Sequence, residues 1–272
     1  MGDLFSTLPD PEPSRVIGWF SCGAASAVGI ALELAERPDM EIVRIRIGTE
    51  HKDSDRFAAD CEEKLFRKAI ITLSPPDGDH LAVIRRTRYI KGPHGARCSR
   101  ELKQLVRLAY QRPGDLHVFG FDAEERHRAE DFRENNPDLW FRCPLIEAGV
   151  TKSDCKRVLE RKGIELPAMY RLGYANANCV GCVKGGMGYW NRIRKDFPLM
   201  FDEMAKLERE VGATILRHRS GPLKGERLYL DELDPAAGRF EEDQPGECGV
   251  ICQTALDRVG LGEVSNTEEL AS

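Results

Sequence analysis

The feature that most constrains this chain is a repeated alternation of short apolar runs with longer amphipathic stretches in its first half. The apolar runs have the composition of buried or half-buried β-strands, and the stretches between them have helical composition. Strands that alternate with helices form βαβ units, whose right-handed crossovers build a parallel sheet with helices on both faces. The sequence therefore predicts an α/β, Rossmann-like domain. The expected strands are residues 15–20, 41–47, 69–73, 116–121 and 139–143, and the expected helices are 24–35, 53–68, 79–88, 98–110 and 124–135.

The pattern changes after Gly149. Thr151 and Asp154 form the signature of a helix start, and Gly163 is expected to end that helix. Residues 167–188 are expected to form a loop, and apolar residues at helical spacing from 197 to 211 predict a further core-facing helix. We expect four parts: a flexible arm at 1–14, the α/β domain at 15–150, a helical, cysteine-bearing extension at 151–218, and a loop-rich, exposed tail at 219–272.

Composition excludes several protein classes. The chain has 272 residues and a formal net charge of −5, so a nucleic-acid or membrane-surface partner would need a local basic patch. No run of about 18 apolar residues predicts a membrane span, and the first residues lack the pattern of a secretory signal. We therefore expect a cytoplasmic protein with no membrane contact. Nine cysteines, an odd number, then favour metal binding or thiol chemistry over a disulfide framework.

A run of small residues directly follows the first expected strand and opens the first expected helix. Such a turn lets backbone N–H groups approach a ligand, and a helix N-terminus favours anions. It is neither a Walker A loop nor a dinucleotide fingerprint, because the required lysine and glycines are missing. The competing interpretation is a tight turn whose residues are small only so that the strand and the helix can pack closely. The run is Ser21, Cys22, Gly23, Ala24, Ala25 and Ser26.

Three cysteines have the surroundings of metal ligands. Cys179 and Cys182 form a CxxC in a glycine-rich loop, a spacing that serves zinc, an iron–sulfur cluster or a redox dithiol. Cys98 opens an expected helix, where a thiolate is stabilised. Of the other cysteines, Cys248 and Cys252 are either reactive thiols or small apolar residues that dock the tail, and Cys22 is ambiguous. Core packing is expected for Cys61, Cys143 and Cys155.

The expected helix 98–110 carries Arg100, Lys103 and Arg107 at spacings of three and four residues. This spacing predicts one basic face on the helix. The face would either bind phosphates or lie in solvent.

In this order, the features resemble the phosphoadenosine phosphosulfate reductase-like family of the PP-loop (adenine nucleotide alpha-hydrolase-like) superfamily, over roughly residues 14–185. Ser21, Gly23 and Ser26 resemble the family's SGGxxS phosphate loop, and residues 97–103 resemble the segment that contains a cysteine and a Leu-Lys pair in its cluster-bearing branch. Further similar segments are 120–125 with Arg128, 144–146, 169–170, 173–174, 179–182 and Glu247-Cys248-Gly249, which is similar to the catalytic tail of the reductases.

The resemblance implies a PP-loop fold that binds ATP or adenosine phosphosulfate, with Mg²⁺ as a further candidate, beside a [4Fe–4S] cluster. It implies Cys98, Cys179 and Cys182 as cluster ligands. The implied nucleotide-binding residues are Ser21, Cys22, Gly23, Ala24, Ser26, Thr49, Lys103, Gly120, Glu125 and Arg128.

The chain also departs from the family pattern. Ala25 replaces an Asp of ATP-using members, Ile47-Gly48-Thr49 replaces Asp-Thr-Gly, and Ser99 replaces a second cysteine. The tail lacks the His that follows Cys-Gly in the family. Three cysteines would bind three of the four irons of the cluster. The fourth iron would be bound by Cys22, Cys248 or Cys252, or would stay open and hold sulfide.

Three functions follow as hypotheses. The first is ATP-dependent sulfur transfer to an acceptor, with nucleic acid as one candidate. The second is a sulfonucleotide reductase in which Cys248 attacks sulfur, Cys252 is a second reactive thiol and a thioredoxin-like protein releases sulfite. The third is a non-enzymatic nucleotide-binding subunit with a structural metal. We also expect a homo-oligomer, and for the first function a sulfur-donor protein.

Overall fold

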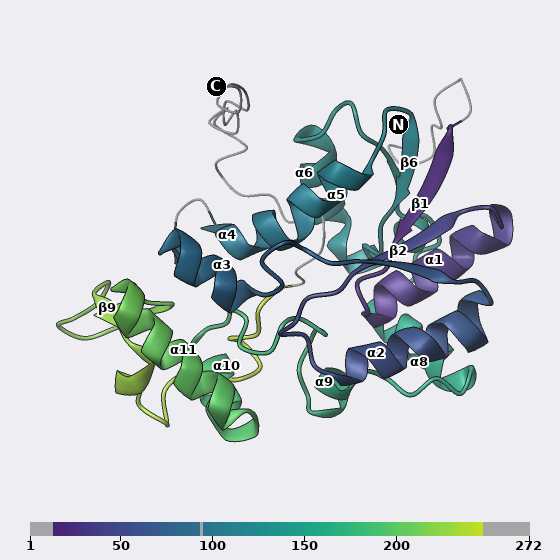
Figure 1. Ribbon diagram of the computed structural model, residues 1–272. Helices are drawn as coiled ribbons and strands as arrows, with labels where there is room; N and C mark the ends of the chain where they lie inside the picture. The colour runs from purple at the N-terminus through teal and green to yellow at the C-terminus, as the bar shows by residue number, and fades with distance from the viewer. Residues whose placement is uncertain (1–12, 93–94, 247–272) are drawn as a thin grey trace, which may run out of the picture.

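The computed structural model describes residues 13–92 and 95–246, and Figure 1 shows their arrangement. Its centre is a parallel sheet of five strands in the order β3-β2-β1-β6-β7. This arrangement confirms the expected α/β, Rossmann-like layout, with strand ends within a few residues of their predicted positions. The strands are β1 (Arg15–Trp19), β2 (Glu41–Ile45), β3 (Ile70–Leu73), β6 (Asp115–Val118) and β7 (Trp140–Arg142).

Helices cover both faces of the sheet. One face packs against α1 (Ala24–Glu36), α2 (Asp53–Asp60) and α8 (Lys152–Arg161), which lie together on one side of the strands in Figure 1. The buried cysteines Cys22, Cys61 and Cys155 belong to this apolar cluster, so Cys61 and Cys155 pack in the core as expected. The other face packs against α3 (His80–Thr87), α5 (Leu105–Tyr110) and α6 (Arg126–Glu134), and Cys143 is buried there.

Two helices contain a π-helical segment. After α2 the chain continues without a break into a π-helix at Cys61–Phe66. The second case is the expected helix 98–110, which consists of α4 (Arg97–Ser99), a π-helix at Arg100–Gln104 and then α5. A π-turn closes over five residues instead of four, so the residues after it do not keep the angular phase of those before it.

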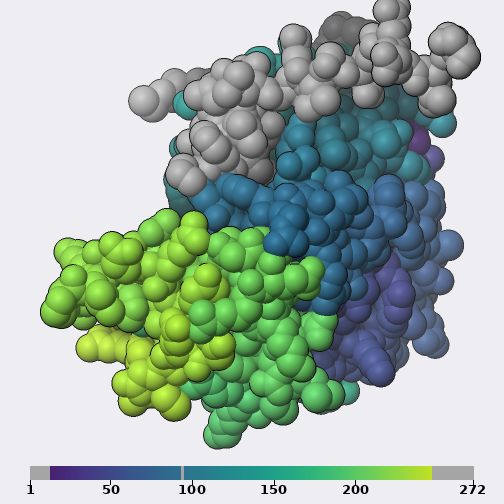
Figure 2. All heavy atoms as spheres, turned by 60° about the vertical axis from the view of Figure 1, so that its left-hand side comes forward, coloured from purple at the N-terminus to yellow at the C-terminus, as the bar shows by residue number. Residues whose placement is uncertain are grey.

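The chain after residue 168 packs on α3. A third apolar cluster joins Leu81 and Ile84 of α3 to Trp190 of α10 (Met187–Asp196) and Met204 of α11 (Pro198–Val211). Figure 2 accordingly shows the green-to-yellow surface of the later residues against the blue surface of the earlier ones. The shorter elements are β4 (Lys91–Gly92), β5 (Gly95–Ala96), a 3-10 turn (Ala123–Glu125), α7 (Pro144–Glu147), α9 (Ala168–Arg171), β8 (Leu216–Arg217), β9 (Arg227–Leu228) and a 3-10 turn (Leu230–Glu232).

Two sequence expectations differ from the structure in this region. The expected loop 167–188 contains α9 and the start of α10, whose N-cap is Gly186 without a side-chain cap. A helix that starts without a capping side chain gives little sequence signal. In the tail, Leu228, Leu230 and Leu233 are buried, so the described part of 219–245 is not simply exposed. No helix in the described residues combines the length and the apolar character that crossing a membrane requires.

Candidate functional site

A pocket lies where the strand order of the sheet changes direction. The chain runs outward from β1 to β2 and β3, and then returns to the other side of β1 with β6 and β7. Ligands of open α/β sheets bind in the crevice at the carboxyl ends of the strands that flank such a switch point. The pocket has about 570 Å³ of empty space, part of it open to solvent. It is lined by Trp19, Phe20, Ser21, Ser26, Val43, Ile45, Glu50, Lys103, Phe119, Gly120, Phe121, Glu125 and Arg128.

The loop between β1 and α1 is organised by one hydroxyl group. The Oγ of Ser26 accepts hydrogen bonds from the backbone N–H of Ser21, at 3.1 Å, and from the Ser21 hydroxyl, at 3.0 Å. The same Oγ donates to the carbonyl of Gly23, the N-cap of α1, at 3.0 Å. Ser26 is 2% exposed, so these bonds are made inside the protein. The expected phosphate loop is therefore a defined turn with its two serines on the pocket.

Gly120 fixes how closely β6 approaches this loop. A Cβ atom added at position 120 would stand 2.5 Å from the Cα and 2.6 Å from the backbone nitrogen of Ser26. Real Cβ atoms do not approach backbone atoms so closely, so the residue after Phe119 must be a glycine for the two segments to touch. The resemblance implied a role for Gly120 near the nucleotide, and the structure places it at the floor of the pocket.

Cys22 adopts a conformation that favours glycine. Its φ angle is 56°, in the left-handed region that costs an L-residue about 1–2 kcal/mol. The side chain is 1% exposed in the apolar cluster under α1, and burial raises the pKa of its thiol. Cys22 is absent from the lining of the pocket that holds the other three candidate ligands. Its position fits a packing role better than the expected nucleotide contact or cluster ligation.

The N-terminus of α1 is also contacted from a distant part of the chain. The backbone N–H of Ala24 donates to the hydroxyl of Tyr170, in α9, at 3.4 Å. The ammonium of Lys156 lies 4.7 Å from the centre of the Tyr170 ring. Tyr170 thereby places a hydroxyl and a nearby cation beside the phosphate loop.

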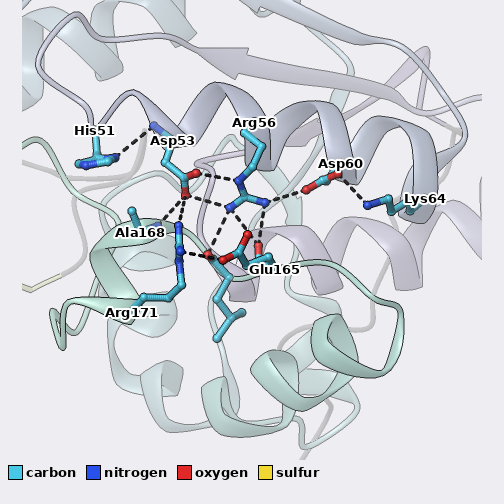
Figure 3. Close-up of polar contacts among 9 residues, drawn as sticks. His51, Asp53, Arg56, Asp60, Lys64, Glu165, Ala168 and Arg171 are labelled. Carbon is cyan, nitrogen blue, oxygen red and sulfur yellow. Dashed lines mark hydrogen bonds and ion pairs between the residues drawn. The ribbon is translucent and has the colours of Figure 1, made fainter.

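A polar network holds the segment that carries Tyr170, as Figure 3 shows. Asp53 accepts a hydrogen bond from the backbone N–H of Ala168 at 2.7 Å, and the Arg56 guanidinium binds both oxygens of the Asp53 carboxylate at 2.7 and 2.8 Å. Arg56 also donates to the carbonyls of Glu165 and Leu166. These bonds lower the pKa of Asp53 to about 2, chiefly through Arg56. The network ties α2 to the chain just before Tyr170.

Trp19 has a fixed orientation in the pocket wall. Its indole N–H donates to Nδ1 of His117 at 2.9 Å. His117 is buried, and burial lowers the pKa of its imidazole to about 4, with a further contribution from the positive charge of Arg107. The imidazole is therefore neutral near pH 7 and can accept the Trp19 proton.

The pocket contains charged groups of both signs. Burial raises the pKa of Glu50, and the nearby Lys103 and Arg44 oppose that shift. Arg44 is buried and pairs with Glu50 at 3.4 Å and with Asp55 at 2.8 Å. Glu125 pairs with Arg128 at the other end of the pocket.

A second pocket of about 360 Å³ brings together the three expected metal ligands. Lys103 lines both this pocket and the first, so the two are neighbours. Within the described ranges, no group of three or more His, Cys, Asp or Glu side chains converges closely enough to mark a metal-ion site. The pocket is lined by Ile47, His80, Cys98, Ser99, Leu102, Lys103, Cys179, Cys182, Val183 and Lys184.

The CxxC loop has a defined backbone. The N–H of Cys182 donates to the Tyr189 hydroxyl at 2.9 Å, and the N–H of Val180 donates to the Thr49 carbonyl at 2.8 Å. Gly181 has a φ of 74°, and an added Cβ would stand 2.8 Å from the Met200 side chain. The loop therefore needs its central glycine both for conformation and for space.

Thr49 lines neither the switch-point pocket nor the pocket of the three cysteines (the thiol pocket), but it contacts a residue of the latter. Its hydroxyl shares a hydrogen bond of 2.6 Å with Nδ1 of His80. His80 is 2% exposed and lines the thiol pocket with the three cysteines. The expected contact between Thr49 and a nucleotide stays a prediction.

The expected basic face of residues 100, 103 and 107 is not formed. Lys103 lies between the two pockets, whereas Arg107 is 1% exposed, with its guanidinium 5.9 Å from the centre of the Phe132 ring. Burial lowers the pKa of Arg107 to about 10. The π-helix at Arg100–Gln104 changes the phase of the helix, which a spacing argument for a regular α-helix cannot anticipate.

The expected tail thiols Cys248 and Cys252 lie outside the described residues. The chain immediately before them is held next to the CxxC loop. The side chain of Asn176 donates to the carbonyl of Pro245 at 3.0 Å, and that of Asn178 donates to the carbonyl of Gly246 at 3.0 Å.

Several pocket residues escaped the sequence analysis. Trp19, Phe119, Phe121 and Glu50 line the switch-point pocket but were not expected there. The three aromatic residues share one signal, because each lies in a strand that flanks the switch point or within three positions after it. Neither protein-family models nor curated proteins include a match to this chain.

Proposed function

We propose that the protein is an adenine-nucleotide-dependent enzyme of sulfur chemistry that transfers sulfur to an acceptor. The observation that carries this proposal is that Lys103 lines both the switch-point pocket and the pocket of the three cysteines. A nucleotide in the first pocket and a thiol-bound group in the second would share one cation. This juxtaposition suits a reaction in which an activated acceptor meets a sulfur carrier.

The first pocket has the properties of a nucleotide site. The turn at Ser21–Ser26 and the N-terminus of a 13-residue helix supply backbone N–H donors for phosphates. Trp19, Phe119 and Phe121 offer aromatic surface for a base. The proposed fold is that of the PP-loop superfamily.

The second pocket has donors that fit an iron–sulfur cluster. Cysteine thiolates are the usual ligands of such clusters, and Cys98, Cys179 and Cys182 would hold three of four irons. Among the described residues that line the pocket, His80 and Ser99 are further potential donors. A bound cluster would supply an iron on which sulfide can be held.

The residues of the chain have separate tasks in this proposal. The turn at Ser21–Ser26 binds the phosphates of ATP, and Mg²⁺ remains a prediction. An oxygen of the acceptor attacks the α-phosphorus, and pyrophosphate leaves with the electron pair of the broken bond. Lys103 balances the negative charge that accumulates between the pockets. Sulfide then replaces AMP on the acceptor, so each turnover yields one AMP and one pyrophosphate.

Anaerobic purification followed by iron, zinc and sulfide analysis tests the proposal. We expect a brown protein with iron and sulfide in equal amounts, which binds ATP or its non-hydrolysable analogue. Cys98→Ala should lose most of the iron, and Cys155→Ala, a buried cysteine outside both pockets, should keep it. A colourless zinc protein, or full iron content in Cys98→Ala, would contradict the ligand assignment.

A second candidate is a sulfonucleotide reductase. The observation that favours it is the position of Gly246, which lines a pocket with Glu125 and Arg128 and precedes Cys248 by two positions. In this reaction the Cys248 thiolate attacks the sulfonate sulfur and the nucleotide phosphate leaves. A thioredoxin-like dithiol then reduces the S-sulfonate, which releases sulfite and forms a disulfide in the partner.

Two assays separate the candidates. Sulfite release from adenosine phosphosulfate that disappears in Cys248→Ser supports the reductase. Pyrophosphate release from ATP that depends on an added acceptor supports sulfur transfer. Nucleotide binding with neither activity would support the third hypothesis, a nucleotide-binding subunit with a structural metal.

A further inference from the structure

A third cavity lies beside the thiol pocket and belongs to neither proposed site. It is an open groove with about 1,270 Å³ of empty space, part of it solvent. Four separate segments of the chain form it, which include β4, the start of α10 and β8. Its lining includes the basic or acidic residues Lys91, Lys184, Arg217, His218, Arg219 and Asp243.

The groove is basic although the chain as a whole is acidic. Four lysine and arginine side chains line it against two carboxylates, those of Glu242 and Asp243, while the whole chain has a net charge of −5. Both carboxylates have arginine partners: Asp243 pairs with Arg219, and Glu242 pairs with Arg239 at 2.7 Å. Outside these two pairs, the positive charges of Lys91, Lys184 and Arg217 line the same groove.

Asp243 also occupies the N-terminus of α10. Its carboxylate accepts hydrogen bonds from the N–H of Gly188 at 2.7 Å and of Arg239 at 3.1 Å. The start of this helix is thus already satisfied by an anion of the protein. Attraction for an external anion must come from side chains, chiefly Lys91, Lys184 and Arg217.

The groove leads to the sites described above. Lys184 lines the groove, the thiol pocket and the pocket that contains Glu125, Arg128 and Gly246. Burial lowers the pKa of Lys91, and the negative charges of Cys182 and Glu208 oppose that shift. An anionic chain in the groove would therefore have one part beside the thiols.

We propose that this groove binds the phosphate backbone of a nucleic acid strand, which is the acceptor of the reaction. Cations from separate segments match the repeated charges of a phosphate backbone, and the His218 ring adds a surface on which a base can stack. An acidic peptide would use the cations but not the ring. The assignment of the strand as acceptor rests on the proposed function, whereas the binding itself does not.

Fluorescence anisotropy with labelled single-stranded RNA, single-stranded DNA and duplex DNA tests this inference on the full-length protein. We expect binding that weakens with salt. At 0.1 M salt, loss of one phosphate contact should reduce affinity about five- to eightfold, because the exponent per contact is about 0.7 for single strands and 0.9 for duplex. Arg217→Gln should show this loss and a salt slope smaller by about one contact.

The chain offers a matched control in the same hairpin. Arg227 lies opposite Arg217 in the antiparallel pair of β8 and β9. Each arginine donates a hydrogen bond through Nη1 to a backbone carbonyl. Only Arg217 lines the groove, so Arg227→Gln should bind nucleic acid like the unchanged protein. Equal losses in the two variants would mean a general charge effect and would overturn the inference.

Two further outcomes would also overturn it. One is the absence of oligonucleotide binding at about 50 mM salt, where phosphate contacts are strong. The other is competition by poly-glutamate as effective as that by unlabelled oligonucleotide, which would indicate an acidic protein partner. If groove binding fails while ATP binding and iron content remain, this inference alone falls. If groove binding persists without iron or ATP binding, the proposed function falls.

Discussion

Gly120 and Ser26 are packed so closely that no side chain fits between them, with only 2.5 Å from an added Cβ at position 120 to the Cα of Ser26. Gly120 follows β6, and Ser26 lies in the first turn of α1. The contact therefore joins the two strands that flank the switch point through the phosphate loop. Both residues line the switch-point pocket, so the contact sets the shape of that pocket.

The first prediction concerns this contact. Gly120→Ala should force the loop away from β6, at a cost of about 1–3 kcal/mol in unfolding free energy, and should weaken ATP binding at least tenfold. Gly29→Ala is the control, because its Cβ would stand 3.5 Å from the Leu145 side chain, an ordinary contact. Urea unfolding and isothermal titration calorimetry measure the two effects. Tight ATP binding by Gly120→Ala would mean that the pocket is not the nucleotide site.

The second prediction concerns the conformation of Cys22. Because glycine adopts a positive φ without strain, Cys22→Gly should be more stable than Cys22→Ala by about 1 kcal/mol. Both variants should keep the iron and sulfide content of the unchanged protein, since Cys22 does not line the thiol pocket. Iron loss in both variants would instead identify Cys22 as the fourth ligand.

The third prediction separates two aspartates that bind the same arginine. Asp53→Asn removes the carboxylate that holds both Arg56 and the Ala168 N–H, and should reduce unfolding free energy by about 1–3 kcal/mol and weaken ATP binding. Asp60 also binds Arg56, at 2.7 Å, and its other partner in Figure 3 is Lys64 and not that segment. Asp60→Asn should therefore cost less than about 1 kcal/mol and leave ATP affinity unchanged. Equal effects on ATP affinity would remove the positioning role of Asp53.

The fourth prediction is a pH dependence of stability. His117 has a folded-state pKa of about 4, below its ordinary value of 6.5. Its contribution is fully present above pH 6.5 and is lost as the pH falls toward 4, by up to about 3 kcal/mol. His117→Asn keeps an acceptor for the Trp19 indole but does not titrate, so its unfolding free energy should fall less over this interval. Equilibrium unfolding followed by tryptophan fluorescence provides the measurement, and equal pH slopes would refute the assignment.

The sheet and the turn between β1 and α1 could be predicted because their signals are local. Strands 15–20 and 116–121 are apolar over their own length, and the small residues from Ser21 to Ser26 follow the first strand directly. The order of strands then follows from general rules of handedness. Such signals need no knowledge of which distant segments meet.

The rest of the site depends on contacts between distant residues. Nothing in the sequence near Tyr170 indicates that its hydroxyl meets the N–H of Ala24, 146 positions earlier. The association of His80 with Thr49 and the three cysteines likewise follows from the packing of α3 against later helices. The start of α10 was missed because Gly186 gives no capping signal.

The π-helix at Arg100–Gln104 separates two environments along one helix. Cys98 precedes the π-helix and Lys103 lies within it, and both line the pocket of the three cysteines. After the π-helix, Arg107 is buried against the Phe132 ring. The two ends of the helix can therefore face their neighbours at angles that one regular α-helix would not allow. Deleting one residue within 100–104 would restore a single α-helical phase, and the chain would then have to give up either the anchor or the alignment of its reactive end.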